Sequence, residues 1–240
     1  MKSLIITIFI LLTLITFGKD ISSLKNDIES EYYSFNIKRH NGLIKELKKI
    51  ENLEVKNYYL ALEFHTLGKI VYNKDKDLAL KYFEYSISSI NKSISNRKHQ
   101  SMLPEYYAIL SSALGKKSSL SGLSAVYWGY KAKDAFDKGF ELDSNNHKVR
   151  LIGAIHLMHV PEILGGDKKR ARATLENLLN LKSEPRTNFE INWAEKPEIF
   201  AYLAQIDILE KNFNSKYIDS ALKYQPNYDF VNIDLYNQTK

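Results

Sequence analysis

Apolar residues recur at intervals of three and four positions along nearly the whole chain after residue 20. The first stripe of this kind comprises Ile21, Leu24, Ile28, Tyr32 and Phe35. This spacing places apolar side chains on one face of a helix, whereas a half-buried strand requires alternation. No stretch alternates long enough to indicate a strand with confidence, so the sequence predicts an all-α chain.

The five prolines lie where these stripes start or stop, which is the placement typical of helix boundaries. They are Pro104, Pro161, Pro185, Pro197 and Pro226. Together the stripes and prolines predict about ten helices, at 21–36, 41–51, 55–73, 76–94, 103–117, 121–142, 147–158, 168–182, 197–210 and 214–224, with a further short helix possible at 228–236.

An internal repeat is clearest between Phe64 and Ile90, where one helix carries Leu67 and Gly68 and the next carries Ala79 and Phe83. Small residues at such positions let two helices approach closely, while large residues fill the groove between neighbouring pairs. Equivalent small residues occur later in the chain, at Ala132, Gly153, Ala171 and Ala221. We therefore expect these six small residues, the two glycines and four alanines, to face neighbouring helices. A generic helical bundle is the alternative.

These units resemble the tetratricopeptide repeat (TPR), in which aromatic-x2-Leu-Gly is followed by Ala-x3-Phe and a proline at the unit's end. The run 221–228, Ala-Leu-Lys-Tyr-Gln-Pro-Asn-Tyr, matches that terminal pattern closely. The third unit departs from it, because eighteen residues separate Gly153 from Ala171 whereas eleven separate Gly68 from Ala79. The resemblance implies an antiparallel helical-pair, TPR-like solenoid over residues 19–240.

A narrower resemblance covers residues 104–182 and, more loosely, 196–230. The sequence around Gly165-Gly166-Asp167 is similar to one group of exported bacterial TPR proteins that carry a Gly-Gly-Asp loop insertion in a central repeat. That resemblance implies an exported helical-repeat protein without a settled biochemical activity.

Residues 1–18 combine Lys2 with a charge-free apolar run from Leu4 to Phe17. Fourteen residues are too few for a typical membrane-spanning helix but suit the apolar region of a secretory signal. We therefore expect a signal peptide at 1–18 and export to the periplasm or cell envelope. An uncleaved anchor is the alternative, in which case this segment would be the chain's membrane contact.

The charged residues are interspersed along the chain and do not form a basic block. Thirty-four Lys and Arg against 28 Asp and Glu leave a net charge of +6, and cysteine is absent. A mixed, lysine-rich surface is usually solvated, so no nucleic-acid partner is expected. Without cysteine the chain cannot form disulfides or thiolate metal sites.

Aromatic residues provide the main candidates for binding. Tyr127, Trp128 and Tyr130 cluster in one predicted helix, and Tyr and Trp are favoured on recognition surfaces. They could equally pack between helices. Gly165 and Gly166 precede a helix start, where backbone N–H groups can hold an anion. However, Asp167 at that start could itself cap the helix, which would make the loop structural.

The remaining polar clusters are weaker. His156, His159 and Glu162 have helical spacing for metal ligands, but Pro161 interrupts the helix and we expect no metal or cofactor. The stretch 118–122, Ser-Ser-Leu-Ser-Gly, is interpreted as a turn and helix cap because it lacks the context of a nucleophile.

The sequence therefore predicts a non-catalytic interaction or scaffolding module that binds a protein or peptide. In a repeat array that ligand would lie in the concave groove, with Tyr127, Trp128, Tyr130 and the 158–167 loop at the groove and its rim. The alternative is a periplasmic small-ligand or transport-accessory protein similar to the T component of TRAP transporters. It would need an enclosed pocket lined by convergent polar groups.

Overall fold

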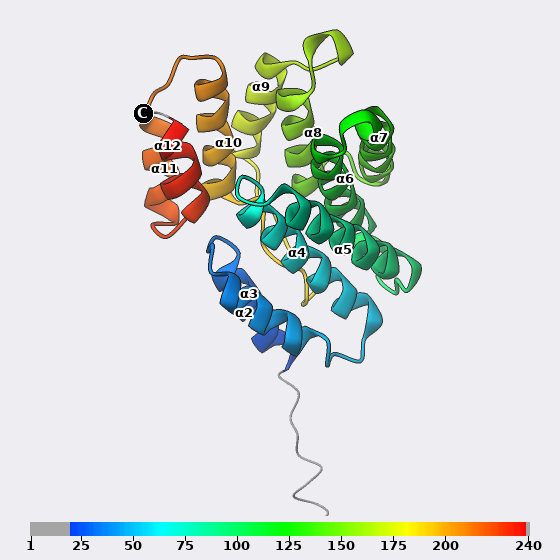
Figure 1. Ribbon diagram of the computed structural model, residues 1–240. Helices are drawn as coiled ribbons and strands as arrows, with labels where there is room; N and C mark the ends of the chain where they lie inside the picture. Colours follow the sequence, from blue (N-terminus) through cyan, green and yellow to red (C-terminus); the bar gives the residue numbers. More distant parts are fainter. Residues whose placement is uncertain (1–19, 239–240) are drawn as a thin grey trace, which may run out of the picture.

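The computed structural model describes residues 20–238, and within that range the chain is helical and contains no strand (Figure 1). The α-helices are α2 (Ile21–Glu31), α3 (Ile37–Leu47), α4 (Leu53–Val71), α5 (Lys76–Ser95), α6 (Leu103–Leu120), α7 (Ala125–Leu142), α8 (His147–His159), α9 (Lys168–Leu178), α10 (Lys196–Leu209), α11 (Lys216–Tyr224) and α12 (Tyr236–Gln238). Short 3₁₀ turns occur at η1 (Gln100–Met102), η2 (Gly122–Ser124) and η3 (Glu162–Leu164), and η4 (Phe230–Leu235) is a π-helical turn.

Consecutive helices pack as pairs: α2 with α3, α4 with α5, α6 with α7, α8 with α9, and α10 with α11. The first helices of successive pairs also touch, because α6 contacts both α4 and α8, and α8 contacts α10. These first helices form an inner layer and the second helices lie outside it (Figure 1). The all-α fold of paired helices predicted from the sequence is confirmed.

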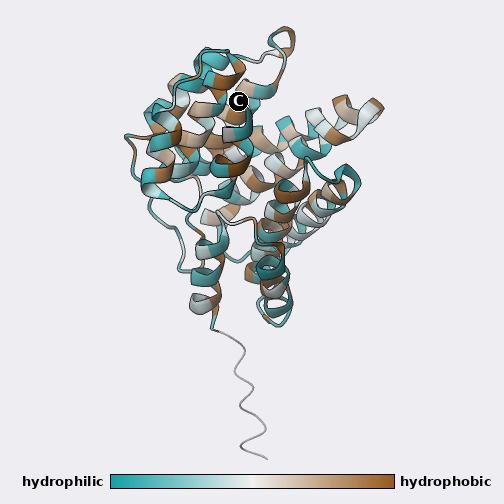
Figure 2. Ribbon diagram, turned by 60° about the vertical axis from the view of Figure 1, so that its left-hand side comes forward, coloured by the Kyte–Doolittle hydropathy of each residue, from teal (hydrophilic) through white to brown (hydrophobic). Residues whose placement is uncertain are grey.

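Among the inner helices, α4, α6, α8 and α10 are buried around most of their circumference, whereas the outer helices and α2 bury one face. On α4 most residues are buried, while on α9 only Ala171, Leu175 and Leu178 are. Figure 2 shows this difference, with brown hydrophobic segments on the central helices and teal segments mainly on loops and outer turns. Within residues 20–238, no helix combines the length and apolar character required to cross a membrane.

The small residues lie where the repeat pattern predicts. Ala79, Ala132, Ala171 and Ala221 are buried, Gly68 is buried and Gly153 is half-buried. A Cβ atom at Gly68 would lie 2.6 Å from the ring of Phe83, and one at Gly153 would lie 2.8 Å from the ring of Phe136. Each glycine therefore receives an aromatic ring from a neighbouring helix.

Several predicted boundaries are wrong near the N-terminus. The helix expected at 21–36 ends at Glu31, and the helix expected at 41–51 covers Ile37–Leu47. The second begins early because the Asn36 side chain accepts a hydrogen bond from the backbone N–H of Arg39, and so caps it. Asn52 caps α4 in the same way, through the N–H groups of Glu54 and Val55.

The stretch 118–122 also differs from expectation. Helix α6 continues to Leu120, so Ser118 and Ser119 are helical and are not part of a turn. Gly122 has a φ of +50°, which favours glycine, and it is the first residue of the turn η2. Helix α7 consequently begins at Ala125, four residues later than predicted, and Ser124 makes no side-chain capping bond.

The first and last parts of the array meet. The Phe35 N–H donates to Asp229 Oδ2 at 2.6 Å, and the Asp229 N–H donates to the Tyr33 carbonyl at 3.0 Å. The rings of Tyr33 and Tyr228 pack edge to face with centroids 4.7 Å apart. In Figure 1 the blue pair α2 and α3 accordingly lies beside the orange and red C-terminal helices. The described helices thus curve round until the two ends touch.

Candidate functional site

Helices α4 and α6 lie side by side in a fixed register of 47 residues. Three hydrogen bonds join side chains with this separation, at seven-residue intervals along both helices. His65 Nε2 lies 2.8 Å from Ser112 Oγ, and the Tyr72 hydroxyl lies 2.8 Å from Ser119 Oγ. In the third of these bonds, seven residues before His65, the Tyr58 hydroxyl donates to the Glu105 carboxylate. Lys69 and Lys116 are also 47 residues apart. They occupy equivalent positions on the two helices, between the His65–Ser112 bond and the Tyr72–Ser119 bond.

A cavity lies between the inner helices beside this register. Its wall includes His65 and Lys69 from α4, Ser112 from α6, Ile155 from α8 and Tyr202 from α10. The empty space is about 340 Å³ when the open mouth is included, but the enclosed cavity volume is only about 20 Å³. The enclosed part therefore has room for one small group and not for a whole metabolite.

Lys69 and Lys116 are half-buried cations without an anionic partner in contact. Within residues 20–238 neither ammonium group makes a hydrogen bond or an ion pair. Lys69 Nζ lies 4.9 Å from the centre of the Tyr32 ring and Lys116 Nζ 5.2 Å from that of Tyr72. Burial lowers the pKa of both lysines, and repulsion from Lys69 contributes to a pKa of about 8 for Lys116.

Two carboxylates influence these lysines from a distance. Glu198 favours the charged form of Lys69, but its oxygens accept hydrogen bonds from the Tyr32 hydroxyl and the Ala194 N–H. Asp234 on η4 favours the charged form of Lys116, and burial raises the pKa of Asp234 itself. Neither carboxylate forms an ion pair with the lysine it influences.

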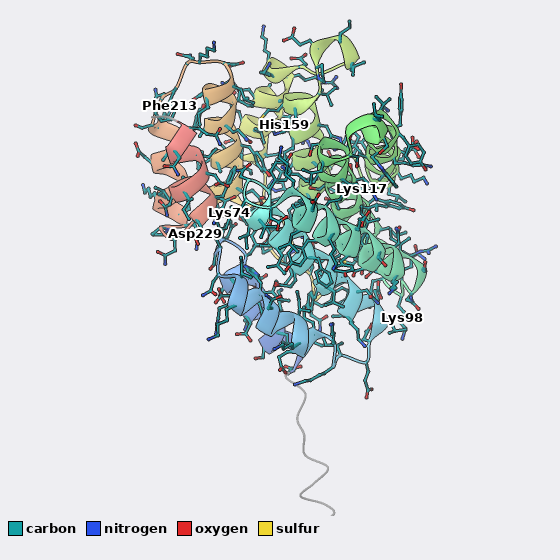
Figure 3. The ribbon with its side chains drawn as sticks, in the orientation of Figure 1. Lys74, Lys98, Lys117, His159, Phe213 and Asp229 are labelled. Carbon is teal, nitrogen blue, oxygen red and sulfur yellow. The ribbon has the colours of Figure 1, made fainter. Side chains whose placement is uncertain are left out.

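Two further residues with basic side chains lie near the ends of the inner helices. His159 lies near the upper end of α8 and Lys74 lies just beyond the end of α4 (Figure 3). Lys74 and Lys116 both act on the pKa of Asp234. Burial and repulsion from Lys116 lower the pKa of His159 to about 4, so His159 is uncharged near neutral pH. The cationic groups of this region therefore come from the ends of α4 and α6.

A separate charged cluster is buried lower in the inner layer. Lys148 Nζ donates to Glu105 at 2.7 Å, to Glu190 at 2.6 Å and to the Ile191 carbonyl at 2.7 Å. Burial raises the pKa of Glu105 to about 7. Burial also acts to raise the pKa of Glu190, but the attraction of Lys148 and the hydrogen bonds to Glu105, Lys148 and the Arg186 N–H together lower it. All three ammonium protons have acceptors, and none of the three side chains lines the cavity. The cluster therefore joins α8 to α6 and to the connection between α9 and α10.

What this cluster holds is the connection between α9 and α10, which covers the inner face. Tyr59 donates to the Phe189 carbonyl at 2.8 Å, the Ile191 N–H donates to the Tyr58 hydroxyl at 2.9 Å, and the Trp193 indole donates to Glu105 at 2.8 Å. Phe189, Ile191 and Trp193 are buried. Part of the concave face expected to receive a peptide is thus covered by the chain's own extended segment.

Tyr127, Trp128 and Tyr130 lie on α7, an outer helix, and not on the inner helices that line the cavity. Tyr127 and Tyr130 are 56% and 67% exposed. Trp128 is half-buried beneath Lys117, whose Nζ lies 3.9 Å from the ring centre. Leu123 and Val126 are exposed on the same side, so Leu123, Val126, Tyr127 and Tyr130 form a stripe with intervals of three, one and three residues. We call these four residues the α7 stripe.

The loop after α8 has the structural features that the sequence suggested. Gly165 has a φ of +95°, and a Cβ atom at Gly166 would lie 1.7 Å from the Val160 carbonyl oxygen. Asp167 Oδ1 accepts from the Arg170 N–H at 2.8 Å and so caps α9. The capping role of Asp167 is therefore confirmed. Within residues 20–238, no hydrogen bond, ion pair or ring contact joins this loop to Tyr127, Trp128 or Tyr130.

The metal-ligand spacing at the end of α8 is not realised as a site. His156 Nε2 lies 3.3 Å from Ser111 Oγ, and burial lowers the pKa of His156 to about 4. His159 is exposed and Glu162 lies in the turn η3. Among the described residues, no group of three or more histidine or acidic side chains could hold a metal ion.

The lysines at the cavity were missed in the sequence, although a signal was present. Leu-Gly-Lys occurs at 67–69 and again at 114–116, which is the 47-residue register of α4 and α6. The repeat pattern drew attention to the leucine and glycine, because those residues pack. The repeated lysine is not part of that packing pattern and lies near the C-terminal end of each helix.

Comparisons with known proteins give no match: no protein-family model, curated protein or solved structure matches this chain.

Proposed function

We propose that this chain is an exported, non-catalytic module of the TPR type that binds another protein. The paired helices with small residues at their contacts support a repeat array, and such arrays serve mainly as binding scaffolds. The expected signal peptide at 1–18 lies outside the described residues, so export stays a part of the proposal.

The observation that carries the proposal is the α7 stripe. Its members are far more exposed than is usual for apolar side chains, with Leu123 fully exposed and Val126 67% exposed. Contiguous exposed apolar surface on a helix is typical of protein contact sites. Lys131 lies next to this stripe, with its Nζ 5.7 Å from the Tyr127 ring centre, so the complementary partner surface is apolar with an acidic edge. The concave groove is a poorer site because residues 189–193 already cover part of it.

The experiment compares recovery of envelope proteins by the tagged wild type and by a Val126→Glu/Tyr130→Glu double variant. Both changes are at exposed positions and should leave the fold intact, which circular dichroism checks. We expect the double variant to lose at least ten-fold of the recovered partner. The matched control is Tyr85→Glu on α5, which is 43% exposed and lies outside the stripe. Equal recovery by wild type and double variant would contradict the proposal.

The small-ligand alternative, similar to the T component of TRAP transporters, has one observation in its favour. The inner helices surround a partly open cavity whose wall includes the polar side chains of His65, Lys69 and Ser112, as such a protein would need. The cavity accepts only a small group, which restricts the ligands that this alternative can invoke.

A further inference from the structure

We infer that the ends of α4 and α6 form a binding site for a small oxyanion, a phosphate or carboxylate group, held between Lys69 and Lys116. The inference goes beyond the proposed protein interaction and does not depend on the α7 stripe. It would supply the ligand class for the small-ligand alternative.

The first argument is the geometry of the two lysines. The bonds from His65 to Ser112 and from Tyr72 to Ser119 fix the register of α4 and α6 on either side of Lys69 and Lys116. The two side chains therefore leave equivalent positions on adjacent helices and cannot move apart by sliding of the helices. Two like charges held in this way repel each other, and an anion between them would offset that repulsion.

The second argument is the absence of a protein anion in contact. Among the described residues, no carboxylate lies within ion-pairing distance of either ammonium group. Glu198, the acidic group on the cavity wall, is already engaged by Tyr32 and Ala194. A bound oxyanion would accept hydrogen bonds from both ammonium groups, and such charge-assisted bonds are the strong ones.

The third argument is the chemistry of the surrounding wall. Lys69 lines the cavity together with His65 and Ser112, which supply polar atoms. Lys116 is not part of this lining, but it follows Ser112 by one helical turn on α6 and so lies beside it. The enclosed space fits one small group, so an oxyanion would enter while any larger ligand body stayed at the mouth. Asp234 favours the charged form of Lys116 without pairing with it, and would therefore compete with the anion for Lys116.

The test titrates the full chain with sodium phosphate or sodium acetate at constant ionic strength, with sodium chloride as the third arm. Isothermal calorimetry should show saturable binding of phosphate or acetate that chloride does not reproduce. Whichever of the two binds identifies the oxyanion class. Lys69→Gln and Lys116→Gln should each weaken binding at least ten-fold, and Asp234→Asn should strengthen it several-fold.

The matched control is Lys117→Gln, which removes an adjacent lysine that pairs with Glu84. It should bind like the wild type, as should the Val126→Glu/Tyr130→Glu variant. Failure of the α7 experiment with retained anion binding would thus leave this inference standing. Equal loss in Lys117→Gln and Lys116→Gln, or no difference between the three salts, would overturn it.

A stability measurement separates a ligand site from a purely structural role of the lysines. Because the pKa of Lys116 is lowered to about 8 from 10.5, the unfolded chain binds more protons than the folded one between these values. Stability of the free protein should therefore rise with pH in this window, and bound anion should reduce the rise. Lys116→Gln should stabilise the anion-free protein at pH 7. If Lys116→Gln destabilises the protein, the lysine serves to neutralise the partial negative charge at the C-terminal end of α6, and the inference is wrong.

Discussion

At Gly68 the lack of a side chain decides how closely α4 and α5 approach. The ring of Phe83 is fully buried and lies where a Cβ atom at residue 68 would be, at 2.6 Å. Gly68→Ala would force the ring to move within a packed core, at a cost of ~1–3 kcal/mol. Alanine returns up to ~1 kcal/mol through its helix propensity. We expect urea unfolding to show a net loss of about 1–2 kcal/mol.

Gly42 provides the matched control, because it also lies in a helix but a Cβ atom there would meet nothing within 4 Å. Gly42→Ala should therefore raise the free energy of unfolding by ~0.5–1 kcal/mol. In a Phe83→Leu background the penalty of Gly68→Ala should shrink, since leucine lacks the ring edge. An unchanged penalty would show that the contact with Phe83 is not its cause.

At the scale of elements, the sequence predicted which segments are helical better than where they begin and end. The stripes that predicted α4, α5 and α8 arise from buried faces, which leave a strong periodic signal. Boundaries depend on single capping side chains, such as Asn36 and Asn52, and asparagine is common in loops as well. The helix expected at 121–142 begins four residues late for a similar local reason, the left-handed conformation of Gly122.

The connection between α9 and α10 was the element that sequence reasoning missed. Its buried residues Phe189, Ile191 and Trp193 alternate with the polar Glu190 and Asn192, which is typical of an extended segment. The alternation is too short to indicate a strand, and the segment forms none. It is held by side chains from distant helices, and the sequence carries no local sign of those contacts.

Lys148 should be the main anchor of this connection. Lys148→Met would leave the buried carboxylates of Glu105 and Glu190 without their cation, and breaking a buried pair in this way costs about 3–5 kcal/mol. Hydrogen exchange should accelerate at residues 186–194 before the rest of the chain unfolds, because Glu190 and the Ile191 carbonyl lose their donor.

Lys133→Met is the appropriate comparison for Lys148→Met, because the Lys133 pair with Asp137 is exposed. That change should alter the free energy of unfolding by no more than ~0.5 kcal/mol. If Lys148→Met costs as little, or if exchange at residues 186–194 is unchanged, the buried cluster does not anchor the connection.

On the scale of the whole molecule, the contact between the two ends changes how an array of helical pairs should behave. In an open array each pair touches only its neighbours, so the terminal pairs can unfold independently. Here Tyr32 hydrogen-bonds Glu198 across 166 residues, and Phe35 bonds Asp229 across 194. No repeat pattern predicts such contacts, because the pattern describes neighbouring pairs. Because the two ends of the array meet, the apolar residues that remain exposed, including the α7 stripe, lie mainly on the outer helices and turns.

Closure makes a prediction that an open array does not. Asp229→Ala removes the acceptor of the Phe35 N–H bond at 2.6 Å, and loss of such a bond to a charged group costs ~1–3 kcal/mol. Because this contact joins the segment that follows α2 to the residue that precedes η4, hydrogen exchange should accelerate together at residues 21–35 and 228–235. Asp219→Ala, which removes an exposed hydrogen bond with Ser215, should change neither segment. Faster exchange confined to residues 228–235 would mean that the N-terminal pair does not depend on closure and that the array behaves as an open chain of neighbours.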